Sequence, residues 1–320
     1  MIVVVCLNPA LDVTHQLDTV GWGRVNRPRA VHARPGGKGL NAARTLHALG
    51  ADVLVLGLAG GITGAGVEAS LRERGVRAAF APVAGETRRT FTVVDGSVTD
   101  SGVTAFHEAG PEVSEDEFAG FLARYERALA GAAAVVLSGS LPPGLEAGTY
   151  ATLVEAATAA GVPAVLDAHG EALRRGAAAG PAIVKPNLAE LAALAGPTAS
   201  SALAARGGAE LAAVAAVAAG ELGGAEAVVV TLGADGLLAA TGDGCWRARV
   251  PAAVAGNATG AGDAVAAALA HGIVLGRPWH ERLRHAAALG AATAAAPVAG
   301  EFRQQDYLGA LRAVAVDKVR

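Results

Sequence analysis

The sequence predicts an α/β fold in which a mostly parallel central sheet carries helices on both faces. Short runs rich in valine, isoleucine and leucine alternate with alanine- and leucine-rich stretches long enough to form helices, an order typical of β-α-β units. The short runs are apolar throughout rather than at every second residue, as expected of strands covered on both faces. Polar residues gather where several of these runs end, and ligands of parallel sheets bind beyond the carboxyl ends of the strands. Together these three observations predict a ligand-binding α/β domain.

Each predicted element follows from this alternation. Strands of the main sheet are expected at residues 2–7, 53–58, 134–138, 164–167, 183–185 and 227–231. Helices are expected at residues 39–49, 64–74, 115–129, 148–160, 188–195 and 203–222. Two further segments, at about 13–33 and 87–107, are rich in valine, threonine and arginine with a strand-like period, which predicts a small β lid or dimer face. No repeat or linker divides the chain, so a single domain over residues 1–320 is expected.

The composition limits the classes of function. Hydrophobic residues make up 52% of the chain and charged residues 17%, which is enough apolar surface to bury a large core. The net charge of −3 argues against a nucleic-acid or membrane-surface protein, because such proteins usually carry a basic face. The two cysteines, Cys6 and Cys245, form neither a disulfide framework nor a metal-binding spacing. The apolar N-terminal run lacks the basic segment of a signal peptide and predicts a buried strand, so a cytoplasmic location is expected.

The most informative motif is the segment 257–263, Asn-Ala-Thr-Gly-Ala-Gly-Asp, which runs directly into an alanine-rich helix. Its small residues, Gly260, Ala261 and Gly262, allow the backbone to approach an anion, and the N–H groups that open the helix point toward that anion. Asp263 lies in the first turn, where it could accept the proton of an attacking hydroxyl group during phosphoryl transfer. A glycine turn followed by an aspartate that caps the helix is the alternative.

A second glycine motif, Gly-Gly-Lys-Gly-Leu-Asn at residues 36–41, also leads into a helix. It lacks the spacing of a Walker A loop, in which a Lys-Ser/Thr pair follows a longer glycine loop. Gly37 in the turn, with Lys38 and Asn41 beside it, suits a polyhydroxylated anionic ligand, because the amide can bond to hydroxyl groups and the ammonium can pair with charge. A flexible loop with a solvated lysine is the alternative.

A third motif, Lys-Pro-Asn-Leu-Ala-Glu at residues 185–190, joins the end of a strand to a helix. Asn187 and Glu190 lie three residues apart on the first helical turn and share a face. Their oxygen atoms could hold the water shell of Mg²⁺, which takes few protein ligands and keeps most of its waters. A capping box, in which the two residues satisfy each other's backbone N–H groups, is the alternative.

In this order the motifs resemble the ribokinase-like (PfkB) carbohydrate kinase family, and in particular the branch that contains 1-phosphofructokinase and tagatose-6-phosphate kinase. The resemblance extends from Asn8 to about Gly290 and is carried by NPALD, GGKGLN, SGSLPPG, KPNLAEL, TLGADG and GAGD. It implies a ribokinase-like three-layer fold and a sugar kinase that depends on ATP and Mg²⁺. It also implies a homodimer in which the lid strands of two chains pack together.

The resemblance implies a role for each motif. Asp263 would deprotonate the sugar hydroxyl, while the backbone amides of residues 260–263 stabilise charge on the transferred phosphoryl group. Asn187 and Glu190 would support Mg²⁺ through water, because Mg²⁺ keeps most of its hydration shell. The residues implied on the nucleotide side are Lys185, Asn187, Thr231, Gly233 and Gly236. Those implied on the sugar side are Asp12, Gly37, Lys38, Asn41, Arg88 and Ser138, with Arg24, Asn26 and Arg27 reaching in from the lid.

The two cations Lys38 and Arg88 could bind a phosphate that the sugar already carries, so a phosphorylated ketohexose is favoured. Fructose 1-phosphate, converted to fructose 1,6-bisphosphate, is the predicted substrate. Tagatose 6-phosphate, fructose 6-phosphate and an unphosphorylated sugar or nucleoside are the alternatives. The chain departs from the family pattern at His107 and His169, which leaves the identity of the sugar open. A sugar-phosphate-binding regulator on an inactive kinase scaffold is the non-enzymatic alternative, and the retained Asp263 disfavours it.

Two other classes of enzyme are disfavoured. Residues 60–66 contain several glycines after a strand, but not the G-x-G-x-x-G spacing of a dinucleotide site. His280 and His285 lie five residues apart and therefore not on one helical face, as a zinc site on a helix would require.

Overall fold

The computed structural model describes residues 1–98, 102–194, 214, 220–250, 259–296, 298 and 300–319. Among these residues a ten-stranded sheet forms the centre of the molecule, in the order β14-β13-β12-β11-β10-β9-β8-β1-β4-β5. Its strands are β1 (Ile2–Cys6), β4 (Val53–Ala59), β5 (Arg77–Pro82), β8 (Ala134–Ser138), β9 (Ala164–Asp167), β10 (Ile183–Val184), β11 (Ala227–Thr231), β12 (Leu237–Thr241), β13 (Gly244–Arg249) and β14 (Ala315–Val319). In that order, adjacent strands from β5 to β11 pair in parallel, whereas β12 pairs antiparallel with β11, β13 with β12, and β14 with β13. The predicted α/β fold with a mostly parallel sheet is confirmed.

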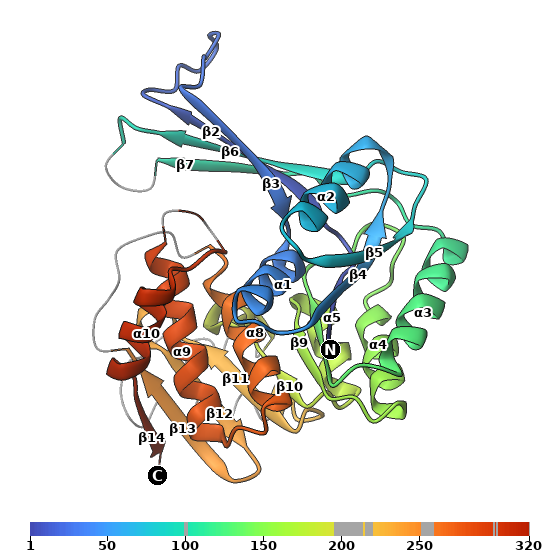
Figure 1. Cartoon of the computed structure of the whole chain (residues 1–320), viewed down its shortest axis with the longest axis vertical. Coiled ribbons are helices and arrows are strands. Elements are labelled where there is room, and N and C mark those ends of the chain that lie inside the picture. The colour runs from blue at the N-terminus through green and yellow to red at the C-terminus, as the bar shows by residue number, and fades with distance from the viewer. Residues whose placement is uncertain are drawn as a thin grey trace.

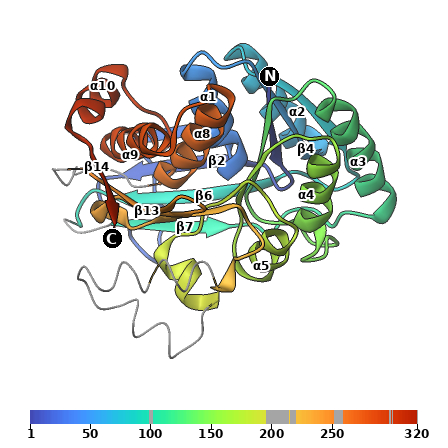
Figure 2. The ribbon, with the colours of Figure 1, turned by 90° about the horizontal axis from the view of Figure 1, so that it is seen from below.

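Helices cover both faces of this sheet (Figure 1). They are α1 (Lys38–Ala48), α2 (Gly61–Glu73), α3 (Glu115–Leu129), α4 (Thr149–Ala159), α5 (Gly170–Ala178), α8 (Ala261–Val274), α9 (Trp279–Ala295) and α10 (Gln304–Ala313), with a short 3-10 turn η1 (Gly233–Asp235) after β11. Alternate residues of β1 separate the two layers. Ile2 and Val4 pack in one core with α1, α2, α8 and α9, whereas Val3 and Val5 pack in another with α3, α4 and α5. Figure 2 shows these two sets of helices on opposite sides of the strands.

The predicted strands coincide with strands of the sheet to within one or two residues, because each is an apolar run that ends at a polar residue or a turn. The helix predicted at 188–195 is helical over residues 188–194. Most of the helix predicted at 203–222 lies outside the residues that the structure describes. In the part of the chain that is described, no helix is both long enough and apolar enough to cross a membrane.

A second sheet of four strands, in the order β3-β2-β6-β7, projects from the carboxyl edge of the main sheet (Figure 1). Its strands are β2 (Ala10–Leu17), β3 (Ala30–Gly36), β6 (Arg88–Asp95) and β7 (Val103–His107). They overlap the two segments predicted to form a lid, although β2 begins three residues before the first segment and β3 ends three residues after it. We call this second sheet the lid sheet. Only Leu7, Asn8 and Pro9 separate β2 from β1, so the lid sheet continues directly from strand β1 of the main sheet.

The register of the lid sheet places a polar and an apolar row of side chains on opposite faces, because successive residues of a strand point to opposite sides. The polar row is Arg34, Asp12, Thr90 and His107. The apolar row beside it is Ala33, Val13, Phe91 and Phe106. The two faces of the lid sheet therefore suit different partners.

Candidate active site

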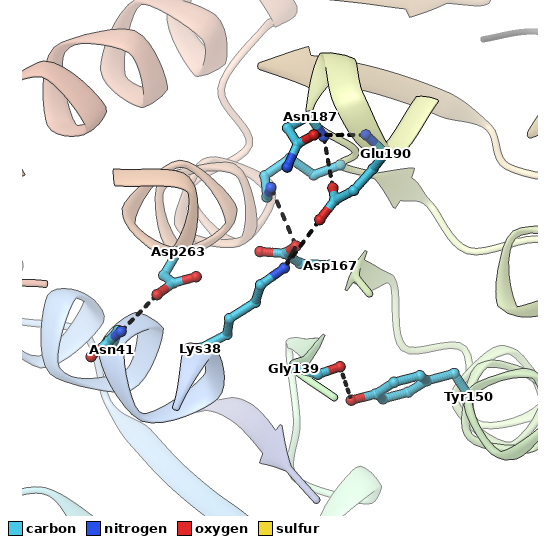
Figure 3. A network of polar contacts seen from close by, with 9 residues as sticks. Lys38, Asn41, Gly139, Tyr150, Asp167, Asn187, Glu190 and Asp263 are labelled. Carbon is cyan, nitrogen blue, oxygen red and sulfur yellow. Dashed lines mark hydrogen bonds and ion pairs between the residues drawn. The ribbon is translucent and has the colours of Figure 1, made fainter. Parts of the chain in front are cut away.

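Side chains from four parts of the chain converge at the carboxyl edge of the main sheet (Figure 3). Asp167 is the last residue of β9, and Lys185 directly follows β10. Lys38 is the first residue of α1, and Asp263 lies in the first turn of α8. Because parallel strands all end at the same edge, motifs that are far apart in the sequence meet here.

Asp167 is the centre of a group of charges that we call the ion cluster. Its Oδ1 atom lies 3.2 Å from Lys38 Nζ and 3.3 Å from Lys185 Nζ. Glu190 completes the cluster, with Oε1 at 3.5 Å from Lys38 Nζ. The side chains of Asp167 and Lys185 are 1% and 3% exposed, so water screens their attraction little. No role was predicted for Asp167, although an acidic residue at the end of a buried strand was a signal for one.

The second oxygen of Asp167, Oδ2, is buried without a hydrogen-bond partner. Ser138 ends β8 beside it, paired in register with Asp167, and the Ser138 hydroxyl is likewise buried and unpartnered. Buried polar atoms are nearly always hydrogen-bonded in proteins. Two such atoms side by side therefore indicate a place that a ligand, an ion or ordered water completes.

Lys38 was predicted on the sugar side, and its ammonium group bonds to Asp167 and Glu190. Burial alone would lower the pKa of Lys38, but the carboxylates of Asp167, Glu190 and Asp263 outweigh burial and raise it above the usual value. The lysine is therefore a cation at neutral pH. About a third of its side chain, 36%, is still exposed, so it can face a ligand as well as its carboxylate partners.

Asp263 is buried in the first turn of α8, where its Oδ2 atom accepts a hydrogen bond of 2.7 Å from Asn41 Nδ2. Burial raises the pKa of Asp263 to about 6, and the negative charge of Asp167 acts in the same direction. The Asn41 bond and the charges of Lys38 and Lys185 oppose this rise. A carboxylate whose pKa lies near the working pH is suited to accept a proton, which is what general base catalysis requires.

The first turn of α8 forms an anion cradle. Gly260 precedes the helix with φ of 86°, a left-handed conformation that favours glycine. The first backbone bond within the helix runs from Ala264 N to Gly260 O, so the N–H groups of the residues between them have no partner inside the helix. A Cβ atom on Gly262 would lie 3.5 Å from Lys185 Nζ, which places the lysine directly over the cradle. Asn257 and Ala258 of the motif lie outside the residues that the structure describes.

Asn187 and Glu190 form the capping box that was the alternative for their motif. Glu190 Oε2 accepts from the Asn187 N–H group at 2.8 Å, and Asn187 Oδ1 accepts from the Glu190 N–H group at 2.8 Å. The cap fixes the Glu190 side chain so that its other oxygen, Oε1, faces Lys38. The cap and a role near Mg²⁺ are therefore compatible, and the metal role stays a prediction.

The donors around the ion cluster fit a divalent cation that is bound through water. Among the described residues, no group of three histidine, cysteine, aspartate or glutamate side chains is arranged to hold a metal ion directly. Three carboxylates, those of Asp167, Glu190 and Asp263, face two ammonium groups, so negative charge is in excess when all are ionised. This donor set fits Mg²⁺, which keeps most of its waters and commonly binds together with nucleotide phosphates.

The residues predicted on the nucleotide side lie next to this cluster. Thr231 at the end of β11 donates its backbone N–H group to Pro186 O at 3.0 Å, which joins it to the segment that carries Lys185. Gly233 and Gly236 bound the turn that follows, with φ of 61° and 87°. A Cβ atom on Gly236 would lie 2.1 Å from the carbonyl oxygen of Ala248, so only glycine fits there.

The residues predicted on the sugar side lie at the root of the lid sheet. Asp12 Oδ1 accepts a hydrogen bond of 2.6 Å from the Thr90 hydroxyl. A Cβ atom on Gly36 would fall within 2.2 Å of this carboxylate, so the glycine leaves the room that Asp12 occupies. Gly37, with φ of 100°, then turns the chain into α1. The hydrogen bond from Thr90 thereby holds Asp12 near the site. Among the residues that the structure describes, no charged side chain forms an ion pair with Asp12.

The other predicted sugar-side residues lie at the two ends of the lid sheet. Arg88 uses its guanidinium group at the lid root, where Nε donates to Asn8 O at 3.2 Å and Nη1 to Glu108 O at 3.3 Å. Arg24, Asn26 and Arg27 are exposed in the loop between β2 and β3, at the far end of the lid sheet (Figure 1). The Asn26 side chain bonds to the backbone of its own loop. A role for these residues toward a substrate stays a prediction.

The comparisons with known proteins agree with this geometry. The family model described as pfkB family carbohydrate kinase matches residues 5–304. Phosphofructokinase-2 from Escherichia coli, in a complex with fructose-6-phosphate, is 28% identical with a TM-score of 0.80, over 97% of this chain and 98% of that one. A protein from Thermotoga maritima described as a possible 1-phosphofructokinase is 25% identical with a TM-score of 0.85, and the two chains match over 100% of each.

Ribokinase from Arabidopsis thaliana, complexed with ribose and ATP, shares the fold at 23% identity with a TM-score of 0.73, over 97% of this chain and 98% of that one. The family model covers nearly the whole chain, including both glycine motifs and the residues of the ion cluster. The chain therefore belongs to the pfkB family of carbohydrate kinases and is a sugar kinase.

Proposed function

We propose that this kinase transfers the γ-phosphoryl group of ATP to a hydroxyl group of a phosphorylated ketohexose, and that fructose 1-phosphate, converted to fructose 1,6-bisphosphate, is the substrate. One observation carries the proposal. The buried carboxylate of Asp263 lies at the opening of the α8 anion cradle, where the positive charges of Lys38 and Lys185 act on it. A base, an anion site and two cations in one place are the parts that phosphoryl transfer needs.

In the proposed reaction Asp263 accepts the proton of the substrate hydroxyl as that oxygen forms its bond to the γ-phosphorus. The bond between this phosphorus and the bridging oxygen of ATP breaks, and ADP leaves with the electron pair. The N–H groups that open α8 and the ammonium of Lys185 stabilise the charge on the transferred group. Mg²⁺ bound with ATP would neutralise phosphate charge, and Asn187 and Glu190 would hold its waters.

Cations near the polar row of the lid sheet support an anionic sugar. Arg34 lies opposite Asp12 in register, and its Nη1 atom is buried without a hydrogen-bond partner. Lys38 is exposed in part, and Arg88 lies at the same end of the lid sheet. A sugar phosphate would pair with these cations, whereas a neutral sugar would not.

The apolar face of the lid sheet supports a homodimer. Phe106 in the apolar row is 53% exposed, and Val31, which shares that face, is 56% exposed. They lie on the two edge strands of the lid sheet, β3 and β7, and exposed apolar residues gathered on one face mark interaction surfaces in soluble proteins. We propose that a second copy of the chain packs its lid sheet against this face.

The test is ATP turnover with purified enzyme and Mg²⁺ against fructose 1-phosphate, tagatose 6-phosphate, fructose 6-phosphate, fructose and adenosine. We expect the highest kcat/KM with fructose 1-phosphate, and a turnover at least about 10²-fold lower for Asp263→Asn. Turnover of fructose or adenosine without turnover of any phosphorylated ketose would overturn the substrate assignment. Fructose 6-phosphate is the second candidate, because the phosphofructokinase-2 of similar structure was observed with that sugar.

A further inference from the structure

The side chain of Asn41 contacts two charged side chains. One is Asp263 on α8, and the other is Arg44, three residues further along α1 on the same face. Its Nδ2 group donates to Asp263 Oδ2 at 2.7 Å, and its Oδ1 atom accepts from Arg44 Nη2 at 2.6 Å. A side-chain amide can present either its NH₂ group or its oxygen to a neighbour. Arginine can only donate, so Arg44 selects the orientation in which the NH₂ group of Asn41 faces Asp263. The reversed amide would set oxygen against carboxylate and NH₂ against guanidinium.

Arg44 is itself held by the root of the lid sheet. Its Nη1 group donates to the carbonyl oxygen of Pro35, the next-to-last residue of β3. The other side of the contact is closed by Gly300, whose Cβ position would lie 2.8 Å from Asn41 Oδ1 and 3.3 Å from Arg44 Nη2. Gly300 N in turn bonds to Thr259 O at 3.1 Å, next to the anion cradle. The Arg44–Asn41 contact is therefore confined from both sides.

The charges that act on this contact come from several elements around it. Asp263 faces Asp167 at the end of β9, Lys38 on α1 and Lys185 after β10. Those that act on Arg44 are Arg34 on β3, Asp12 on β2, Glu301, and Arg74 after α2. Burial, followed by the charge of Arg34, lowers the pKa of Arg44 to about 10, so it remains a cation at neutral pH.

We propose that Arg44 is a positioning residue for the base. By fixing the amide of Asn41 it holds a hydrogen-bond donor on Asp263 Oδ2, which orients the carboxylate and leaves the other oxygen for the substrate hydroxyl. Its bond to Pro35 joins this arrangement to the lid sheet, so the base is in place only when the lid root is. The inference rests on the proposed function, in which Asp263 is the base.

The experiment compares Arg44→Met and Arg44→Lys with the wild-type enzyme, in the full chain with ATP, Mg²⁺ and the best sugar of the panel. For Arg44→Met we expect kcat to fall about 10- to 100-fold, because a misplaced base costs that much. We expect KM for ATP to change less than about twofold. The acidic limb of kcat/KM should move up by about 0.5–1 pH unit, because the carboxylate loses a donor that favours its charged form.

Arg44→Lys should recover part of kcat, because an ammonium can still donate to Asn41 Oδ1. The matched control is Arg72→Met, which removes a guanidinium group from the α2 surface, where it pairs with Glu68. The control should leave kcat and the pH profile unchanged. A kcat for Arg44→Met within twofold of the wild type, or an equal loss at every pH with an unmoved limb, would overturn the proposal.

A readout without turnover separates this inference from the proposed function. In ligand-free protein with ¹³C-labelled aspartate, the carboxyl signal that Asp263→Asn removes can be titrated by NMR. Arg44→Met, or Arg44→Lys if the former does not fold, should move that titration to higher pH. If it moves while the wild type phosphorylates nothing, the positioning role stands and the proposed function fails. If it stays in place, the positioning role fails.

Discussion

The edge of the main sheet and the outer lid sheet differ sharply in how their side chains are held. At the sheet edge Asp167, Lys185 and Asp263 are between 1% and 6% exposed, and each has a charged or amide partner within 3.3 Å. At the lid, Trp22 is 76% exposed and Val25 is 82% exposed. Buried pairs keep one geometry because water does not compete for their hydrogen bonds, whereas few contacts within the chain fix the exposed side chains.

This difference indicates that the sheet edge serves the chemical step, whereas the lid sheet would serve sugar choice and assembly. The chemical groups are set before any ligand arrives, which is the arrangement that lowers a barrier through preorganised charge. The groups that would choose a sugar and a second chain lie on the lid sheet, where contacts are few. Changes at the sheet edge should therefore affect turnover and stability, and changes at the lid should affect specificity and assembly.

The largest effect is expected from removing the base. Asp263→Asn should lower kcat by about 10²- to 10⁴-fold, because positioned bases typically contribute that much. The amide keeps the size of the side chain, so binding of ATP and sugar, measured by calorimetry, should change little. A variant that keeps more than a tenth of wild-type turnover would show that another group accepts the proton.

The next effect is on stability at the ion cluster. Asp167→Ala leaves the ammonium of Lys185 buried without its partner and should lower the free energy of unfolding by about 3–5 kcal/mol in urea titrations. The control is Glu171→Ala, which breaks the exposed pairs with Arg174 and Arg175 and should cost less than about 1 kcal/mol. Similar losses in the two variants would contradict the distinction between the buried and the exposed region.

A smaller effect of opposite sign is expected from Asp263→Asn on stability. The pKa of Asp263 is raised to about 6 in the folded protein, against a value near 4 in the unfolded chain, so the protonated carboxyl group favours the folded state. This contribution to the free energy of unfolding is fully present below about pH 4 and is lost as pH rises through about 6. Asparagine does not ionise and escapes this loss. Above pH 7 the ligand-free variant should be more stable than the wild type by ~1–3 kcal/mol. The gap should close toward pH 4, and a gap that is constant with pH would contradict the assigned burial of charge.

The smallest effect on stability is expected at the lid. Phe106→Asp places a charge in the apolar row and should convert the proposed dimer to a monomer in light scattering after size exclusion, with a change in unfolding free energy below about 1 kcal/mol. Ala105→Asp is the matched control, because the neighbouring residue points to the opposite face of β7. A dimer that survives Phe106→Asp, or that both variants disrupt, would place the interface elsewhere.

The main sheet could be predicted because its strands obey a local rule. The run from Ile2 to Cys6 must be apolar at every position, since both faces of β1 are covered, and such a run is visible in the sequence. Strand β5 and the strands β12 to β14 lie toward the ends of the sheet, where burial is less uniform. No continuous apolar run was recognised in these segments, so these strands were not predicted. The helices α5, α9 and α10 were not predicted either.

The motifs of the site could be predicted, but not the bonds between them. Glycine next to Lys38 or Asp263 is a local signal, because the turn that opens a helix onto an anion needs it. That Lys38 pairs with Asp167 and Glu190 depends on how strands and helices far apart in the chain are placed. The orientation of Asn41 depends on Arg44 and Asp263 together, and no spacing in the sequence encodes it.

The short connection between β1 and β2 determines how the lid sheet can swing. Asn8 in that connection is pinned, since its amide donates to Ala109 O at 2.9 Å and to Ser140 Oγ at 3.2 Å. A rotation of the lid sheet would therefore pivot beside Asn8, close to Asp12, and its amplitude would grow toward the loop that holds Trp22. Spectroscopic labels on that loop would report a hinge motion that labels beside Asp12 could not detect. Such a rotation would leave the Asp12 carboxylate nearly still while the far end of the lid sheet moves.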